Sequence, residues 1–284
     1  MASVVTGVSR TAGGAALCRL AEQRQPPGLR QFDDPVVARL LDPMLVAIAQ
    51  ARPLLDQVLA SWPPGTYGGQ VMRTRYIDDV VVAAATEGVT QVVILGAGLD
   101  TRAYRLPELA TATVFEVDLP VIQRRKRRHL RGVPVMAGDV RFVAADLGLP
   151  GLGDTLRDAG VDCASPTLFV CEGVTQYLGE AAVRSTLAAV AGFAAGSALV
   201  FTYVSRALVA ARGEQRPTGG FPGFDASEPW LFGLDRAEVA GFVGNAGLHL
   251  VEDVGEADYQ RRYLAPSGRE LVVGPGERVA LAVR

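Results

Sequence analysis

The sequence has few of the residues that build metal centres and disulfide frameworks. Among its 284 residues it holds three cysteines, Cys18, Cys163 and Cys171, and two histidines, His129 and His249. Three is an odd number, and the spacings match neither a disulfide framework nor a zinc site. We therefore predict no metal, free thiols in a reducing cytoplasm, and structural roles for both histidines.

Long apolar runs and a strong net charge are also missing. The start, MASVVTGVSRTAGG, lacks the apolar segment of a secretory signal, and no stretch approaches the roughly 18 unbroken apolar residues of a membrane span. We expect a soluble, cytoplasmic protein without a membrane partner. The net charge of −2 gives no overall attraction to phosphate backbones, so nucleic acid is not an expected partner. A small molecule is the expected partner. No pattern in the sequence indicates an oligomeric state.

One basic cluster departs from this balance, the run Arg-Arg-Lys-Arg-Arg at residues 124–128. Such a run is compatible with a patch for an anionic ligand or a nucleic acid. Within a helix, however, successive residues are rotated by roughly 100°, so five of them spread around the axis. We favour a solvated helix face.

Residues 1–88 have a helical pattern. Asp42 is a candidate N-cap for a first helix. The segment Trp62-Pro63-Pro64-Gly65 then interrupts the pattern, and a second helix is expected from about Gln70 to Glu87, with Gly88 as its C-cap. We predict an N-terminal helical cap over residues 1–88 that contributes to the binding site.

Residues 89–284 alternate short apolar runs with helical segments, the pattern of a doubly wound, mostly parallel α/β sheet. Residues 205–234, rich in glycine and proline and carrying Phe221, Phe224, Trp230 and Phe232, indicate a loop or lid insertion. The seven candidate strands are Gln91–Leu95, Thr113–Val117, Phe142–Ala145, Thr167–Cys171, Ala198–Tyr203, Leu248–Val251 and Arg278–Val283.

The first of these strands runs directly into a glycine turn, Gly96-Ala97-Gly98. Glycines at such a turn let the backbone bend sharply and approach a nucleotide-type ligand, although close helix packing has the same requirement. Thr101 stands where a dinucleotide fingerprint has its third glycine, which disfavours a nicotinamide oxidoreductase.

The second strand ends in Asp118, 22 positions after Gly96. This is the usual distance for a carboxylate that binds ribose hydroxyls. A helix N-cap is the plainer alternative for Asp118. Strand alternation places Glu116 on the same side, where it either assists or is solvated.

Four motifs, in order, resemble those of one family, the leucine carboxyl methyltransferases with their bacterial branch of polyketide O-methyltransferases. The resemblance covers about residues 30–205. The motifs are Arg73-Thr74-Arg75-Tyr76-Ile77-Asp78, residues 95–106 (LGAGLDTRAYRL) with Phe115-Glu116-Val117-Asp118, Ala144-Ala145-Asp146-Leu147, and residues 171–178 (CEGVTQYL). The resemblance implies a Rossmann-like class I methyltransferase fold with a seven-stranded sheet and S-adenosylmethionine as cofactor.

The resemblance also implies the site residues. Arg73 would pair with the methionine carboxylate, with Arg75 as the fallback, and Glu172 would take the ammonium group. The remaining implied contacts are Gly96 and Gly98 beneath the methionine and ribose, Asp118 on the ribose hydroxyls, and Asp146 with the Leu147 backbone at the adenine.

Tyr177 matches a family tyrosine near the transferred methyl, and we predict that it orients the acceptor oxygen; packing on the turn is its alternative. Because neither histidine falls in a motif, no obvious base is present, which favours a carboxylate acceptor or a phenol already acidified by its own ring system. Tyr203 is a weaker candidate base. The predicted activity is S-adenosylmethionine-dependent O-methylation of a small carboxylate, such as a polyketide. The alternatives are a hydroxyl O-methyltransferase, an enzyme that uses the cofactor without methylating, and a non-catalytic binding protein.

Overall fold

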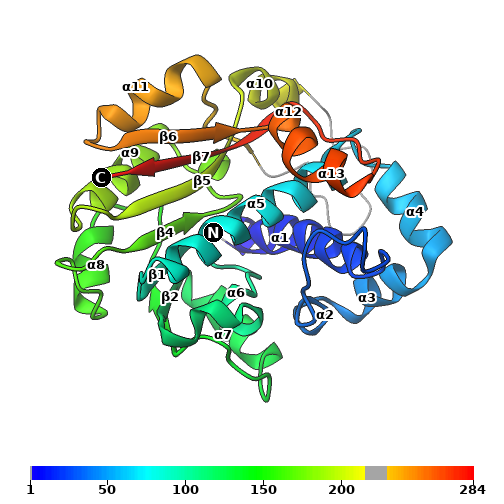
Figure 1. The fold of residues 1–284 in the computed structure, drawn as a ribbon, viewed down its shortest axis with the longest axis horizontal. Coiled ribbons are helices and arrows are strands. Elements are labelled where there is room, and N and C mark those ends of the chain that lie inside the picture. Colours follow the sequence, from blue (N-terminus) through cyan, green and yellow to red (C-terminus); the bar gives the residue numbers. More distant parts are fainter. Residues whose placement is uncertain (1, 215–228) are drawn as a thin grey trace.

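The sheet at the centre of the molecule contains seven strands in the order β3-β2-β1-β4-β5-β7-β6. This computed structural model describes the backbone of residues 2–214 and 229–284 and the side chains of residues 12–212 and 229–284 (Figure 1). The strands are β1 (Gln91–Leu95), β2 (Thr113–Asp118), β3 (Asp139–Ala144), β4 (Leu168–Cys171), β5 (Ala198–Val204), β6 (His249–Val254) and β7 (Glu277–Val283).

All seven predicted strands are present, with ends that differ by a few residues. The five strands β1–β5 pair in parallel, whereas β7 runs antiparallel to both β5 and β6. The prediction of a mostly parallel, doubly wound sheet is therefore confirmed. Crossover helices join the parallel strands, so all their carboxyl ends lie along one edge of the sheet.

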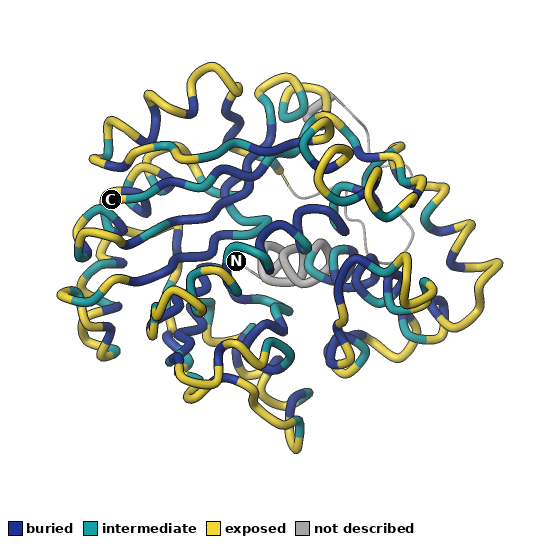
Figure 2. The backbone as a smooth tube through the Cα atoms, viewed as in Figure 1, coloured by how far each residue is buried: buried dark blue, intermediate teal, exposed yellow. Residues whose placement is uncertain are grey.

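Alternate side chains of the strands supply two separate cores. In β1, Val92 and Ile94 face a cluster shared with α5 (Thr66–Thr86), while Val93 and Leu95 face a cluster shared with α9 (Glu180–Ala191). Every residue of β1 is buried, as expected of a central strand covered on both faces. Figure 2 shows the same arrangement, with buried strands inside and exposed outer faces on the helices.

The other helices fall into three groups by their place in the chain. Those that precede the sheet are α1 (Ala2–Glu22), α2 (Val37–Leu40), α3 (Pro43–Gln50) and α4 (Arg52–Ala60). Those between β1 and β6 are α6 (Arg102–Arg105), η1 (Pro107–Thr111), α7 (Pro120–His129), α8 (Leu152–Asp158), η2 (Thr175–Tyr177), α10 (Arg206–Glu214), η3 (Arg236–Glu238) and α11 (Val239–Gly244). The last group, α12 (Glu256–Tyr259), η4 (Gln260–Leu264) and α13 (Ala265–Ser267), precedes β7.

The N-terminal helices form as the local signals predict. Asp42 caps α3 by accepting a hydrogen bond from the Met44 N–H at 2.9 Å, and Gly88 follows the end of α5 with a φ of +91°. Most buried side chains of α1–α4, such as Leu17 and Val37, share a hydrophobic cluster with Trp62, which follows α4.

Two expectations need correction. Within the basic run, Lys126 is only 2% exposed, because its Nζ lies 2.7 Å from the buried Glu116 Oε2; the four arginines are solvated as expected. Within the expected loop at residues 205–234, the first part is the helix α10. Phe221 and Phe224 fall outside the described residues.

Candidate functional site

A deep cleft of about 930 Å³ opens at the carboxyl ends of the parallel strands. This edge of an open α/β sheet is where such folds bind ligands, and the volume is at the upper end of the range for small-molecule sites. All eight site residues predicted from the sequence line it: Arg73, Gly96, Gly98, Asp118, Asp146, Leu147, Glu172 and Tyr177. The structure therefore brings together residues that lie more than 100 positions apart in the chain.

The glycine turn after β1 lies on the floor of the cleft. Gly96 has a φ of +67°, and a Cβ placed there would come within 2.4 Å of Val174 Cγ2. A Cβ placed at Gly98 would have its nearest neighbours at 3.7–4.0 Å, which is ordinary van der Waals contact, and Gly98 itself lines the cleft. Gly96 is thus required for packing against the β4 turn, whereas Gly98, with a φ of +33°, has no neighbour that close.

Asp118 holds this turn in place from the end of β2. Its Oδ2 accepts a hydrogen bond from the Gly98 N–H at 2.6 Å, and its Oδ1 accepts one from the Leu119 N–H at 2.6 Å. Burial raises the pKa of Asp118, and the two backbone N–H groups oppose that rise. Each carboxylate oxygen has a further lone pair, so a diol can still donate to Asp118.

Arg73 and Glu172 meet at the centre of the cleft. Arg73 is 7% exposed; its Nε donates to Glu172 Oε1 at 2.9 Å and its Nη1 to Glu277 Oε1 at 2.5 Å. A Cβ at Gly173, whose φ is +67°, would approach Arg73 Nη2 to 3.1 Å, so glycine follows Glu172 because the guanidinium occupies that space. Arg73 and Glu172 therefore form a buried ion pair that can have a purely structural role, and both residues also line the cleft.

The sequence analysis gave no role to Arg102, which forms ion pairs with Glu172 and with two further carboxylates. Its Nη2 lies 2.8 Å from Glu172 Oε2, its Nε donates to Asp78 Oδ1 at 2.8 Å, and it also pairs with Asp100. Burial pushes the pKa of Glu172 upward, but the guanidinium groups of Arg102 and Arg73 hold it below its usual value. Glu172 thus remains an anion facing the cleft.

The signals for these additional residues differ in strength. Asp100 and Arg102 lie within the motif at residues 95–106, but the sequence does not indicate which residues they pair with. Glu277 begins the last strand and lies 204 positions from Arg73. Only the antiparallel insertion of β7 beside β5 brings it to the cleft, and no local pattern indicates that contact.

Asp146 and Leu147 follow β3 at one end of the cleft. Asp146 Oδ1 accepts a hydrogen bond from the Gly148 N–H at 2.8 Å, which closes a tight turn after β3. Asp146 is exposed and Leu147 is 9% exposed. The pair combines an accessible carboxylate with an apolar surface, as a heteroaromatic base requires.

Tyr177 is carried by the short helix η2, which closes the cleft after β4. The Thr175 hydroxyl donates to the Thr202 carbonyl at 2.7 Å, and the Gln176 carbonyl accepts from the Leu231 N–H at 2.7 Å. Gln176 is 5% exposed, and its Oε1 has no hydrogen-bond partner among the described residues. These contacts fix η2 on both sides while leaving a polar group beside the cleft unsatisfied.

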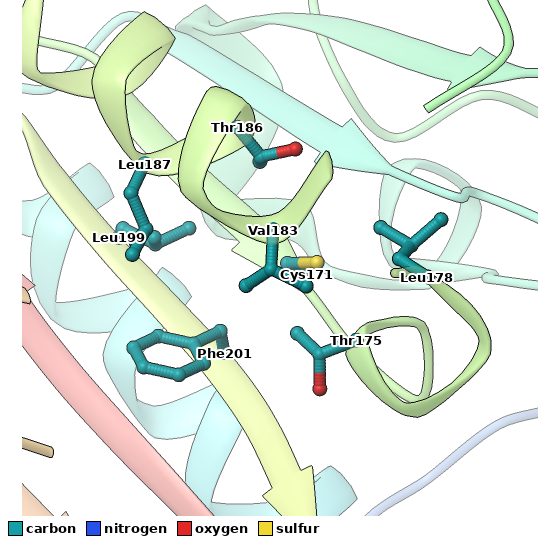
Figure 3. A pocket seen from close by; sticks show the side chains of 8 residues that line it. All are labelled: Cys171, Thr175, Leu178, Val183, Thr186, Leu187, Leu199 and Phe201. Carbon is teal, nitrogen blue, oxygen red and sulfur yellow. The ribbon is translucent and has the colours of Figure 1, made fainter. Parts of the chain in front are cut away.

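Behind η2 lies a second, much smaller cavity of about 10 Å³. Figure 3 shows the side chains of Cys171, Thr175 and Val183 around it. Its volume admits at most one water molecule, and its lining is almost entirely apolar. It is a packing gap between β4, β5 and α9 rather than a ligand site.

Three residues considered in the sequence lie elsewhere. Arg75 does not line the cleft and pairs with Asp79 at 3.0 Å, so it is a poor substitute for Arg73. Tyr203 is 1% exposed and donates its hydroxyl to Asp253 Oδ1 at 2.8 Å; burial and that carboxylate raise its pKa, which removes it as a base. Glu116 is neither a ligand residue nor solvated, since it pairs with Lys126 in the core.

The cleft suits the chemical groups of S-adenosylmethionine. An ionised Glu172 complements an ammonium group, Arg73 complements a carboxylate, and Asp118 can accept from a diol. The glycine turn and Asp118 line the cleft together, and the unsatisfied Gln176 oxygen belongs to a residue that lines the same cleft. The described part of the chain has no helix that is both long and apolar enough to cross a membrane.

Comparisons with known proteins agree with this arrangement. The family model of leucine carboxyl methyltransferases matches residues 12–191. A relative from Mycolicibacterium smegmatis, which carries the name of an S-adenosyl-L-methionine-dependent methyltransferase, is 38% identical over 187 residues, covering 62% of this chain and 59% of the relative. A Parafrankia relative of the same name is 34% identical over 259 residues, covering 85% of this chain and 76% of the relative. The chain thus spans about three fifths of the mycobacterial relative (59%) and more of the Parafrankia one.

Solved structures resemble the fold at low sequence identity. A DUF574 family protein from Streptomyces avermitilis aligns with a TM-score of 0.55 at 15% identity, covering 87% of this chain and 96% of that one. A Thermobifida fusca protein described as a methyltransferase aligns with a TM-score of 0.53 at 19% identity, covering 92% and 98%. The comparisons confirm the predicted fold class and the predicted cofactor, S-adenosylmethionine. This chain belongs to the leucine carboxyl methyltransferase family.

Proposed function

We propose that this protein is an S-adenosylmethionine-dependent O-methyltransferase that forms a methyl ester on a small-molecule carboxylate, such as that of a polyketide or another secondary metabolite. The observation that carries the proposal is the Arg73–Glu172 pair beside Asp118 in one cleft, with Tyr177 on the adjoining turn. The N-terminal helices are proposed as a cap on this site, since Arg19 and Trp62 also line the cleft.

The binding roles follow from charge and position. Glu172 would bind the ammonium group of the methionine part and Arg73 its carboxylate, with Glu277 and Arg102 keeping both side chains in place. Asp118 would bind the ribose hydroxyls. Asp146 and the Leu147 backbone would meet the adenine at the β3 end of the cleft. A cofactor in this orientation lies across β3, β2, β1 and β4 in the order of the sheet.

Bound S-adenosylmethionine supplies an already activated methyl group, so the chain has mainly to position the acceptor and exclude water. We assign Tyr177 to the acceptor: its hydroxyl would donate to one carboxylate oxygen and orient the other. Neither histidine lines the cleft; His249 is exposed, and His129 Nδ1 lies 3.0 Å from the Arg39 carbonyl. A carboxylate, which is ionised at neutral pH, is the nucleophile that needs no base.

The test combines binding with methyl transfer. Calorimetry with S-adenosylhomocysteine should give saturable binding that Asp118→Ala weakens by about 1.5–3 kcal/mol, the scale of charge-assisted hydrogen bonds. With radiolabelled S-adenosylmethionine and 2-naphthoate as the probe acceptor, the product should be an ester cleaved by mild alkali, formed at a rate that is flat from about pH 6 to 9. Tyr177→Phe should lower that rate about three- to tenfold with S-adenosylhomocysteine affinity unchanged.

The same experiment identifies the competing function. An alkali-stable ether formed from 2-naphthol, at a rate that rises with pH and falls more than a hundredfold in Tyr177→Phe, would replace the carboxylate by a hydroxyl acceptor with Tyr177 as its base. Absence of S-adenosylhomocysteine binding would overturn the assignment of the cleft.

A further inference from the structure

A connected network of ion pairs borders the cleft, from α1 at one end to the first residue of β7 at the other. Its members, in order of contact, are Arg19, Asp34, Arg105, Asp78, Arg102, Glu172, Arg73 and Glu277, with Asp100 as a further partner of Arg102. Neighbouring members lie at most 3.8 Å apart, and all except Asp34 and Asp78 line the cleft. The network therefore contributes to the charge that a ligand meets there.

The charges in this network do not balance. It contains four arginines and five carboxylates, so its net charge is −1 when every member is ionised. Burial opposes ionisation of Asp100, but the guanidinium of Arg102 lowers the pKa of Asp100 to about 2. Arg102 and Arg73 likewise keep the pKa of Glu172 below its usual value despite burial. Protonation of these two carboxylates therefore does not remove the surplus at neutral pH.

The surplus negative charge lies at the β7 end of the network. Among the described residues, Glu277 pairs with one cation, Arg73, whose Nη1 lies 2.5 Å from Glu277 Oε1. The same guanidinium donates to Glu172, which has Arg102 as a second partner at 2.8 Å. A further contact of Glu277 is with the neutral amide of Gln70, at 3.3 Å. The Glu277 side chain is 18% exposed and lines the cleft, so its charge acts on a ligand bound there.

Strand pairing places Glu277 toward the acceptor end of the cleft. It lies opposite Val204, the last residue of β5, and β5 follows β4 in the order of the sheet. In the proposed function, on which this inference rests, Arg73 binds the carboxylate of the methionine part and Glu172 its ammonium group. The other carboxylates assigned to the cofactor lie at its ribose and adenine ends. The sulfonium charge, which makes S-adenosylmethionine a net cation, is then matched by the surplus charge at Glu277.

We propose that Glu277 is a specificity-determining residue for the charge of the cofactor, and that it favours cationic S-adenosylmethionine over the neutral product. Methyl transfer breaks the bond between sulfur and the methyl carbon, and the electron pair of that bond stays on sulfur. The acceptor oxygen supplies the electron pair of the new bond. The cofactor thereby loses one positive charge, and Glu277 no longer attracts it. This loss favours exchange of S-adenosylhomocysteine for S-adenosylmethionine.

The experiment compares three ligands by calorimetry: S-adenosylmethionine, S-adenosylhomocysteine, and sinefungin, in which a carbon with an ammonium group replaces the methylated sulfur. All three have the same adenosine and amino acid ends, and the first and third carry the extra positive charge. Glu277→Gln should weaken these two, relative to S-adenosylhomocysteine, roughly 5- to 15-fold. Coulomb's law gives a change of this size for unit charges about 10–15 Å apart at an effective dielectric constant of about 20.

The ratio of cationic to neutral affinity is the diagnostic quantity. Loss of the contact with Arg73 changes all three affinities alike, because every ligand carries the same carboxylate. Glu277→Asp keeps the charge and should keep the wild-type ratio within about twofold, even where the shorter side chain lowers every affinity. Glu270→Gln is the matched control: it removes an equal charge shortly before β7, but Glu270 is exposed and does not line the cleft, so no affinity should change.

A measurement on the wild-type protein alone gives a second test. Between about 0.05 and 0.5 M salt, binding of the two cationic ligands should weaken more than binding of S-adenosylhomocysteine, because salt screens the attraction between opposite charges. Equal weakening by salt would overturn the proposal. So would a Glu277→Gln variant that binds all three ligands less tightly by the same factor, which would make Glu277 purely structural. Failure of the proposed function is distinct from both results, since it would be seen as absent S-adenosylhomocysteine binding to the wild-type protein.

Discussion

Replacing Lys126 by methionine should destabilise the protein strongly, because it removes the partner of a buried carboxylate. Lys126 Nζ lies 2.7 Å from Glu116 Oε2, and the two residues are 2% and 1% exposed. The contact is an ion pair rather than a directed hydrogen bond, since neither Glu116 oxygen has a well-aligned donor in the described part of the chain. Lys126 Nζ also lies 3.3 Å from the Ala97 carbonyl, beneath the glycine turn.

The expected magnitude follows from burial. Removing one member of a buried pair typically costs about 3–5 kcal/mol, because the remaining charge is uncompensated. Burial raises the pKa of Glu116 to about 7 even with Lys126 opposing the rise, so without the lysine this carboxyl should take up a proton at neutral pH. Replacing both residues, as Lys126→Met with Glu116→Leu, should recover most of the loss, because no buried charge remains.

The pH dependence has a definite sign. The folded-state pKa of Glu116 is raised from an ordinary 4.5 to about 7, so the folded protein binds more protons than the unfolded chain between these values. Its contribution to stability is therefore full below about pH 4.5 and is lost as the pH rises through about 7. The difference across this window is on the order of 3 kcal/mol, since each pKa unit corresponds to about 1.4 kcal/mol. Glu116→Gln should remove that slope.

Urea unfolding at pH 6 and pH 8 measures these effects directly. Lys126→Met should lose more stability at pH 8 than at pH 6, because protonation of Glu116 relieves the uncompensated charge at the lower pH. A loss below 1 kcal/mol at both pH values, or a double variant no more stable than Lys126→Met, would refute the reasoning.

Two further predictions concern the glycine turn and the thiols. In urea unfolding, Gly96→Ala should lower the free energy of unfolding by at least about 1 kcal/mol more than Gly88→Ala does. Both glycines have a positive φ, but of the two only a Cβ at residue 96 would meet a neighbour within 4 Å, namely Val174. Equal losses of stability in the two variants would contradict the clash. A thiol reagent should label Cys163 quickly in the folded protein, and it should label Cys18 and Cys171 only after unfolding, because those two thiols are buried with pKa values raised to about 12. Cys163→Ser should abolish the fast reaction. Rapid labelling of two or more thiols in the folded protein would contradict the described burial.

The strands and eight residues of the cleft were predictable because their signals are local. A buried strand followed by Gly96-Ala97-Gly98, or an acid at the end of a strand, indicates its position whatever the rest of the chain does. Parallel topology then brings all the strand ends to one edge, which is why eight predicted residues line a single cleft. The individual binding roles of those residues remain predictions that the experiments above address.

Other features depended on contacts between distant segments. The sequence does not show whether a charged side chain is solvated or buried, so it does not distinguish Lys126 from its four arginine neighbours. The difference comes from Glu116 on β2, which pairs with Lys126 in the core. For the same reason Arg102 had no partner until α5 supplied Asp78.

The alternation of strands and helices, the sheet class and the family follow from the amino-acid sequence alone, since periodicity and short motifs depend on residues close together in the chain. Which charges pair, and what lies opposite them, depends on how distant segments pack in three dimensions. Glu277 reaches Arg73 because β7 inserts antiparallel between β5 and β6, and Arg212 meets Trp230 because the chain returns to the cleft after α10. Both are pairings in space, and the free energy that fixes them comes from burial of the elements that carry them.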